Sequence, residues 1–280
     1  MSVPSLVRPY TALFASRFQQ MLQYRGAAIA GFMTQCWWGG LKVMIFAAFY
    51  SGSVAAASHA PMTLSQAITY TWVGQALLAL MPWFGDPDVS AAVRTGAVSY
   101  DRLRPVDFYS LWYFRAAGWI AARVLPRAAL MLAFAAIVLP LVGLGDWSWR
   151  LPASATAGVL FAISLVLALA LSASMVMLLN IGIAASLNAR GVNALAAGPV
   201  ILLSGNLLPL GLFPDWAQIA LLAQPFAGLL DIPLRIYFGM LDGPAALAGL
   251  GVQAFWIAAL IALGRAWLAR VLRSLEMQGG

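Results

Sequence analysis

The chain has 280 residues, of which 62% are hydrophobic and only 9% are charged, and its mean hydropathy is +0.86. Soluble domains carry about a quarter charged residues, so this composition excludes an ordinary soluble protein. The formal net charge of +7 could suggest a nucleic-acid partner, but the placement of the arginines along the chain, given below, indicates a membrane orientation instead.

The first expected element is a helix over residues 5–24 that lies along the membrane surface. Apolar residues such as Leu6, Phe14 and Met21 recur near helical spacing, and Arg8 with three glutamines can face the wetter side. A leader that only helps insertion is the alternative. Residues 1–26 lack a central apolar stretch, so we expect a cytoplasmic interfacial helix here and no cleavable signal peptide.

Six apolar segments are long enough to cross a bilayer. A hydrocarbon core of about 30 Å needs about 20 residues of helix, and runs of that length exclude the alternating strands of an outer-membrane barrel. The sequence therefore predicts an all-α integral membrane protein with a single transmembrane domain over residues 1–280. The expected spans are residues 27–50, 66–85, 117–143, 156–185, 194–213 and 246–268.

The first span carries three candidate residues of a cargo pathway. Trp37 and Trp38 fall near its middle, away from the interfaces where tryptophan usually gathers, so they could stack on an apolar or cationic aromatic cargo. Packing against helices or lipid is the alternative. Lys42 lies roughly 22 Å into the core, where it either snorkels to the outer interface or lines a cavity.

Catalytic, metal and nucleotide sites are not indicated. The only lysine, Lys42, stands outside any glycine-rich phosphate loop, so ATP and Mg²⁺ would bind to another polypeptide. Cys36 and His59 are each the only residue of their type, which excludes an intrachain disulfide and disfavours a two-residue metal site. We expect no cofactor on this chain and no enzymatic activity of its own.

Residues 86–115 form a charged loop that holds four arginines and four aspartates. Gly96 and Pro105 bound an expected short helix over residues 99–104. Its apolar members could insert into a groove on a cytoplasmic partner. A solvated loop that only fixes topology is the alternative, and the residues alone do not decide between the two.

The arginines lie mostly on one side of the expected spans. They precede the first span, fill the loop between the second and third, and follow the sixth, whereas the opposite side receives only Arg150 and Arg235. This positive-inside pattern predicts that both termini are cytoplasmic.

Prolines interrupt the region around the fifth span. Pro199 and Pro209 should break that span, which then has to face other helices. Residues 215–243 are apolar but interrupted, and predict two short helices that dip into the outer leaflet. Asp231 and Arg235 within them could pair at helical spacing, although Pro233 weakens that geometry. Four asparagines are expected to bond between helices: Asn180, Asn188, Asn193 and Asn206.

Taken in order, these parts resemble the permease subunits of type-two ABC exporters, most closely the bacterial viologen-exporter-like branch. The resemblance covers the whole chain. Its local marks are RTGAVSYDRLRPVDF at 94–108, QPFAGLLDIPLRIYFG at 224–239, and a basic tail that ends in Gln278-Gly279-Gly280. The chain departs from the pattern at residues 90–93, where Ser-Ala-Ala-Val stands in place of the acidic residues of many relatives.

The resemblance implies a role for each part. Residues 98–103 would be a coupling helix on a separate nucleotide-binding subunit, residues 5–24 a connecting helix, and residues 215–243 re-entrant helices that close the outer mouth. The implied coupling residues are Gly96, Val98, Tyr100, Asp101, Arg102, Leu103, Arg104 and Pro105.

The expected protein is therefore half of a bacterial inner-membrane exporter. It would pair with a second, identical or different permease and with ABC ATPase subunits, and would move an unidentified, hydrophobic or cationic solute. The alternative is a membrane scaffold or receptor that recruits a cytosolic protein through the charged loop without transport.

Overall fold

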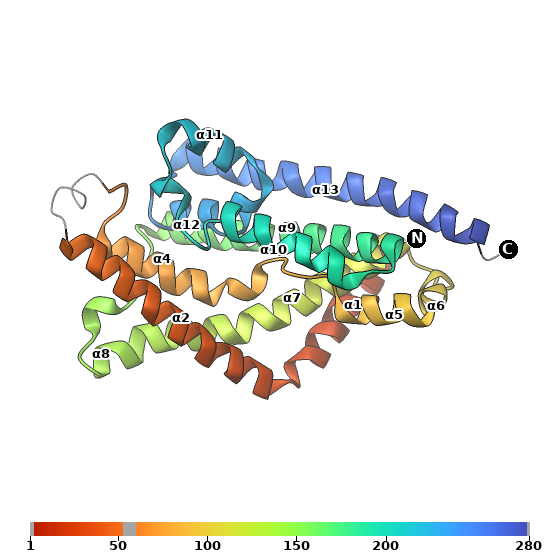
Figure 1. The fold of residues 1–280 in the computed structure, drawn as a ribbon, viewed down its shortest axis with the longest axis horizontal. Coiled ribbons are helices and arrows are strands. Elements are labelled where there is room, and N and C mark those ends of the chain that lie inside the picture. Colours follow the sequence, from red (N-terminus) through yellow and green to blue (C-terminus); the bar gives the residue numbers. More distant parts are fainter. Residues whose placement is uncertain (1–2, 53–59, 279–280) are drawn as a thin grey trace.

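The computed structural model describes residues 3–52 and 60–278, and no β-strand occurs within those ranges. Three helical stretches there are long and apolar enough to cross a membrane: Phe108–Leu141, Ala155–Ser186 and Gly243–Arg273. A shorter apolar helix covers Ala189–Leu203. The all-α class typical of a membrane protein is thereby confirmed, and the long helices run side by side along the molecule (Figure 1).

Helices α1 (Val3–Leu22) and α2 (Arg25–Gly52) meet at a short elbow. A helix is therefore present where the sequence predicts one at 5–24, and it packs along α7 (Phe108–Ala133). The contact is close because Gly118 of α7 lies against the backbone of Phe14, where an added Cβ would come 2.5 Å from the Phe14 carbonyl oxygen. Glycine at 118 thus lets the two helix backbones approach.

Helix α4 (Leu64–Ala76) is shorter than the expected span at 66–85. It begins at a capping box between Thr63 and Gln66, and after Ala76 the chain makes only a 3₁₀ turn, η1 (Leu78–Leu80). Met81 is extended, as a residue before a proline prefers to be. Thirteen helical residues cover about 20 Å, so α4 alone does not reach across a 30 Å core.

The charged loop contains two helices, α5 (Pro87–Thr95) and α6 (Val98–Arg102). Helix α7 then continues through a π-helical turn, η2 (Phe134–Val138), into α8 (Leu139–Leu141). A 3₁₀ turn, η3 (Gly145–Trp147), leads to α9 (Ala155–Ser186), which Ser154 caps.

Helix α10 (Ala189–Leu203) starts and ends earlier than the expected fifth span at 194–213. The following residues are not helical until the 3₁₀ turn η4 (Leu210–Leu212), and Gly205 has a φ of 83° that favours glycine. The segment expected to hold two short helices does contain them, α11 (Asp215–Ala223) and α12 (Asp231–Tyr237), with the 3₁₀ turn η5 (Pro225–Leu229) between them. Helix α13 (Gly243–Gln278) ends the described chain.

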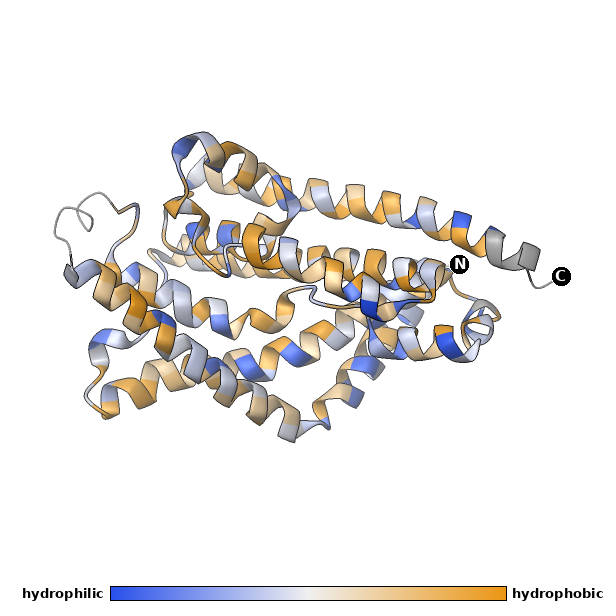
Figure 2. Ribbon diagram, viewed as in Figure 1, coloured by the Kyte–Doolittle hydropathy of each residue, from blue (hydrophilic) through white to orange (hydrophobic). Residues whose placement is uncertain are grey.

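The two ends of the molecule differ. Helices α5 and α6 and both chain termini lie at one end of the long axis, and α8 and α11 lie at the other (Figure 1). Hydrophobic colours dominate the long helices, whereas hydrophilic colours gather around α5 and α6 (Figure 2). The largest buried apolar cluster joins α4, α7, α9 and α12 between these ends.

Candidate functional site

The charged loop begins with a capped helix, α5. Asp86 caps α5 by accepting a hydrogen bond from the Asp88 N–H at 2.9 Å, and Pro87 occupies the first helical position. Gly96 closes the helix with a left-handed φ of 71°, which a residue with a Cβ adopts only under strain. Residues 86–96 are therefore a defined helix and not an irregular stretch.

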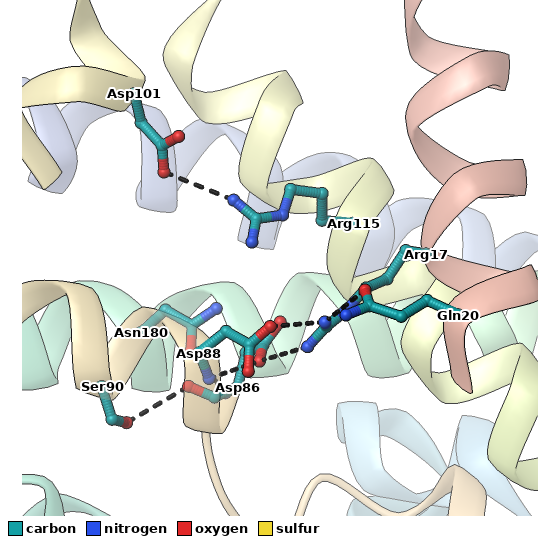
Figure 3. Close-up of polar contacts among 8 residues, drawn as sticks. All are labelled: Arg17, Gln20, Asp86, Asp88, Ser90, Asp101, Arg115 and Asn180. Carbon is teal, nitrogen blue, oxygen red and sulfur yellow. Dashed lines mark hydrogen bonds and ion pairs between the residues drawn. The ribbon is translucent and has the colours of Figure 1, made fainter. Parts of the chain in front are cut away.

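Arg17 of α1 forms ion pairs with the two aspartates at the start of α5. Its side chain is only 6% exposed, and its Nη2 lies 3.2 Å from Oδ1 of Asp86, which is 1% exposed. The same guanidinium pairs with Asp88 and donates to Gln20 Oε1 at 3.0 Å (Figure 3). Helix α1 and the charged loop are thus joined by a buried ion pair, which sequence reasoning missed.

Two asparagines hold the loop from the other side. Asn180 of α9 accepts a hydrogen bond from the Asp86 N–H at 2.8 Å, and Asn193 of α10 accepts one from the Gly85 N–H at 3.0 Å. These two therefore bond between elements, as expected, whereas Asn188 caps its own helix. The base of the loop is consequently fixed to α1, α9 and α10 together.

Asp101 turns inward and fixes α6. Its carboxylate lies 3.3 Å from Arg115 Nη1, accepts from Trp112 Nε1 at 3.2 Å, and lies 3.5 Å from Arg104 Nε. Val98 packs against the apolar cluster that contains Trp112. Of the implied coupling residues, Val98 and Asp101 therefore hold the tip in place and do not face outward.

The other implied coupling residues form the exposed tip of the loop. The side chains of Tyr100 and Leu103 are 72% and 81% exposed, and Gly96, Arg104 and Pro105 are exposed beside them. Helix α6 begins one residue before the expected 99–104 helix and ends two residues earlier. Arg102 is the last residue of α6, and its side chain lies outside the part of the chain that the structure describes.

A mainly apolar hollow of about 340 Å³ adjoins this tip. It lies between α1 and the residues that follow α6, and its lining comprises Pro9, Ala12, Leu13, Ser16, Arg104, Pro105, Val106 and Leu111. At this end of the molecule, the exposed loop tip therefore lies next to an apolar hollow.

Two carboxyl groups of the loop differ in their electrostatics. Burial raises the pKa of Asp86, and the opposing attraction of Arg17 does not cancel that effect. Burial also acts on Asp107, but hydrogen bonds from Ser110 and the charge of Arg265, 3.0 Å away, lower its pKa below the usual value. Asp86 is thus the carboxylate that is harder to keep ionised.

The three candidate pathway residues are not brought together. Trp37 and Trp38 are 70% and 54% exposed on the outer surface of α2. Lys42 faces inward, and its Nζ donates to the carbonyl of Asn206 at 2.6 Å. The ammonium group of Lys42 therefore has a backbone partner after α10, and whether it lies at the outer interface stays a prediction.

A second polar cluster surrounds Asp231 near the other end of the molecule. Its Oδ1 accepts hydrogen bonds from Tyr70 Oη at 3.1 Å and the Leu210 N–H at 2.9 Å, and its Oδ2 binds Arg235 Nε at 2.6 Å. Tyr70 also reaches the Gly205 carbonyl at 3.0 Å. These contacts supply hydrogen-bond partners to the non-helical backbone that follows α10.

The described residues contain no group of three or more metal-ligating side chains. The Sγ of Cys36, a half-buried residue, lies 3.8 Å from the Met131 sulfur, and His59 falls outside the described ranges. No family model, curated protein or solved structure matches the chain.

Proposed function

We propose that this chain is the permease subunit of an ATP-driven exporter in a bacterial inner membrane. It would act with a second permease and with ABC ATPase subunits that bind ATP and Mg²⁺. Both termini and the charged loop would face the cytoplasm. The observation that carries the proposal is an exposed loop tip whose base is fixed to the long helices by buried polar contacts.

The loop is suited to transmit a force. A partner that binds Tyr100 and Leu103 would contact exposed side chains, while Arg17, Asn180 and Asn193 tie the loop base to three other helices. A displacement of the tip therefore moves α1, α9 and α10 with it. The buried ion pair at the loop base fixes the loop relative to α1, as a force-transmitting element requires.

The six-crossing arrangement is part of this proposal. Three crossings would be the long helical stretches, and α2 would be a fourth. Helix α4 with residues 77–85, and α10 with residues 204–213, would complete the set as partly unwound crossings. The contacts from Lys42, Tyr70 and Asp231 to residues 205–210 support the last of these, because they supply the hydrogen-bond partners that lipid cannot.

The short helices α11 and α12 would form re-entrant segments at the outer mouth. Their end of the molecule is opposite to the charged loop (Figure 1). The Asp231 cluster would then hold the outer side closed while the loop is engaged at the inner side. For transport to be driven, the cargo must bind the two resulting states differently.

The test co-expresses this chain with candidate ABC ATPase subunits, selects the one that co-purifies with it, and reconstitutes that complex in vesicles. Replacing Leu103 by Ser and Arg104 by Gln should weaken the complex about tenfold or more, with an equal loss of coupled ATP hydrolysis. Leu151→Ser is the matched control, because Leu151 is 78% exposed and lines a pocket with residues of α4 and none of the loop. Hydrolysis that ignores the double substitution contradicts the coupling role.

The same assay separates transport from recruitment. A complex that forms through the loop but moves no solute would favour the scaffold or receptor. For the cargo, Trp37→Leu and Trp38→Leu should reduce transport of hydrophobic cations, since both indoles are open to a second permease or a solute. Unchanged transport by that double variant would remove the two tryptophans from the pathway.

A further inference from the structure

Arg123 and Arg127 of α7 form a cationic pair that the charged loop does not use. They are four residues apart and so lie on neighbouring turns of one helix face. Among the described residues neither forms an ion pair, since the carboxylate of Asp86 contacts Arg17 and acts on Arg123 only through its charge. Like charges at this spacing repel each other, so an additional anion would stabilise the pair.

Most of the pair's hydrogen-bonding capacity is unused. Each guanidinium carries five N–H donors, and within the described chain the pair makes a single hydrogen bond, from Arg127 Nη2 to the Ala27 carbonyl at 3.2 Å. The Nε of Arg127 is buried without a partner. Arg123 makes no hydrogen bond within the described chain, but its guanidinium carbon lies 4.5 Å from the Trp119 ring and 5.2 Å from the Phe84 ring.

Both side chains are held in position. The two aromatic faces hold Arg123 by cation–π contact. Arg127 fills the space that the missing side chain of Gly31 leaves on α2, where an added Cβ would come 2.8 Å from the guanidinium carbon. The pair is therefore a fixed set of donors, as a binding site requires, and not two mobile side chains.

The depth of the pair matches lipid phosphates. The continuous helix ends at Leu141, so a core of about 30 Å occupies roughly its last 20 residues, from about 122 onward. Arg123 and Arg127 then stand in the first two turns inside the core, next to the headgroup layer. Ala27, near the start of α2, marks the same level.

We propose that Arg123 and Arg127 bind the phosphate of an anionic phospholipid from the leaflet at the charged-loop end. Paired guanidinium forks suit phosphate oxygens, and basic sites between membrane helices on the cytoplasmic side are suited to anionic headgroups. The proposal needs α7 to cross the membrane, but it is independent of ATP coupling and of the partner subunits.

The test uses the full chain in neutral detergent, with native mass spectrometry to count bound phosphatidylglycerol and thermal unfolding to measure its effect. The wild type should retain phosphatidylglycerol in preference to phosphatidylcholine and unfold at a higher temperature with it. The double variant Arg123→Gln/Arg127→Gln should bind phosphatidylglycerol about tenfold more weakly, or not at all. Arg190→Gln/Arg270→Gln is the matched control, because those arginines are exposed and have no ion pair in the described chain.

Two results would overturn the proposal. One is equal retention of phosphatidylglycerol by the wild type and the Arg123/Arg127 variant. The other is an unfolding shift that inorganic phosphate reproduces in full, which would indicate a site for a free anion. If the double variant does not fold, the single variants Arg123→Gln and Arg127→Gln replace it, each expected to retain less phosphatidylglycerol than the control. Loss of lipid binding with intact ATP coupling separates this proposal from the proposed function.

Discussion

The two buried aspartates, Asp86 and Asp231, are each 1% exposed and paired with an arginine, but they do different things. Arg17 is 69 residues from Asp86 and belongs to another helix, so that pair sets the position of the loop relative to α1. Arg235 is four residues from Asp231 on the same helix, and the remaining acceptor capacity of that carboxylate holds unwound backbone. A buried ion pair can therefore fix one element relative to another, as at Asp86, or supply hydrogen bonds to irregular backbone, as at Asp231.

The two pairs also differ in how fully they are satisfied. Both oxygens of Asp231 have partners and only Nη2 of Arg235 is buried without one, whereas Oδ2 of Asp86 and Nε of Arg17 are both buried without a partner. An unsatisfied buried polar atom costs about 1–3 kcal/mol. The pair at the loop therefore contains two such atoms and the pair at Asp231 one.

The largest expected effect is at Asp231. Asp231→Ala removes the acceptor of three hydrogen bonds and leaves Arg235 without its partner, so we expect a loss of about 4 kcal/mol in the free energy of unfolding. Denaturant unfolding in detergent measures it. Asp242→Ala, at an exposed position without an ion pair in the described chain, should change stability little. Equal effects at the two positions would contradict the role given to the Asp231 cluster.

Arg17→Met should cost somewhat less, about 3 kcal/mol, because it leaves the Asp86 carboxylate buried without its cation. In a double-mutant cycle, adding Asp86→Asn should recover much of that loss, since the uncompensated charge disappears. Arg8→Met, at an exposed position of the same helix, is the control. Strictly additive effects of the two substitutions would show that the pair is not coupled.

Gly118→Ala should separate α1 from α7 and so weaken the Arg17 contact indirectly. An added Cβ would meet the Phe14 carbonyl oxygen at 2.5 Å, and such overpacking costs about 2 kcal/mol. Gly198→Ala, where nothing lies within 4 Å of the added Cβ, should cause no loss. If the two alanine variants unfold at the same temperature, the close approach of α1 to α7 is not required.

The smallest effect is a pH dependence of opposite sign at two loop carboxyls. Because the pKa of Asp86 is raised, its contribution to stability is present below the usual value near pH 4 and is lost as the pH rises through the raised pKa. Because the pKa of Asp107 is lowered, its contribution is present above about pH 4 and is lost as the pH falls through the lowered pKa.

Unfolding curves recorded between about pH 3 and pH 7 therefore distinguish the two groups. The stability of the wild type relative to Asp86→Asn should fall as the pH rises from about 4, because only the wild type ionises at this position. The difference between the wild type and Asp107→Asn should shrink as the pH falls toward 3. Parallel curves for both variants would contradict the two assignments.

The long helices could be predicted from sequence because their apolar runs are continuous. The ends of α4 and α10 could not, since hydropathy counts apolar residues whether the backbone is helical or unwound. What permits the unwinding after α10 is a set of partners from distant positions, Lys42 and Tyr70, that no local pattern indicates.

Sequence spacing did predict the contact between Asp231 and Arg235. The doubt that Pro233 raised was misplaced, because Pro233 lies in the first turn of α12, where a backbone N–H has no helical partner to lose. Helix α5 was missed although its signals are local, with Asp86 and Pro87 at the start and Gly96 at the end. By contrast, nothing in the sequence around Arg17 except its charge indicates the ion pair that it forms.

The inward position of Lys42 has a practical consequence. It carries the only side-chain amine of the chain, so an amine-acylating reagent has no competing lysine to modify. Its Nζ must leave the Asn206 carbonyl before it can react. The acylation rate of Lys42 therefore reports how often the contact between α2 and the unwound segment breaks. The measurement uses the native protein and needs no engineered label.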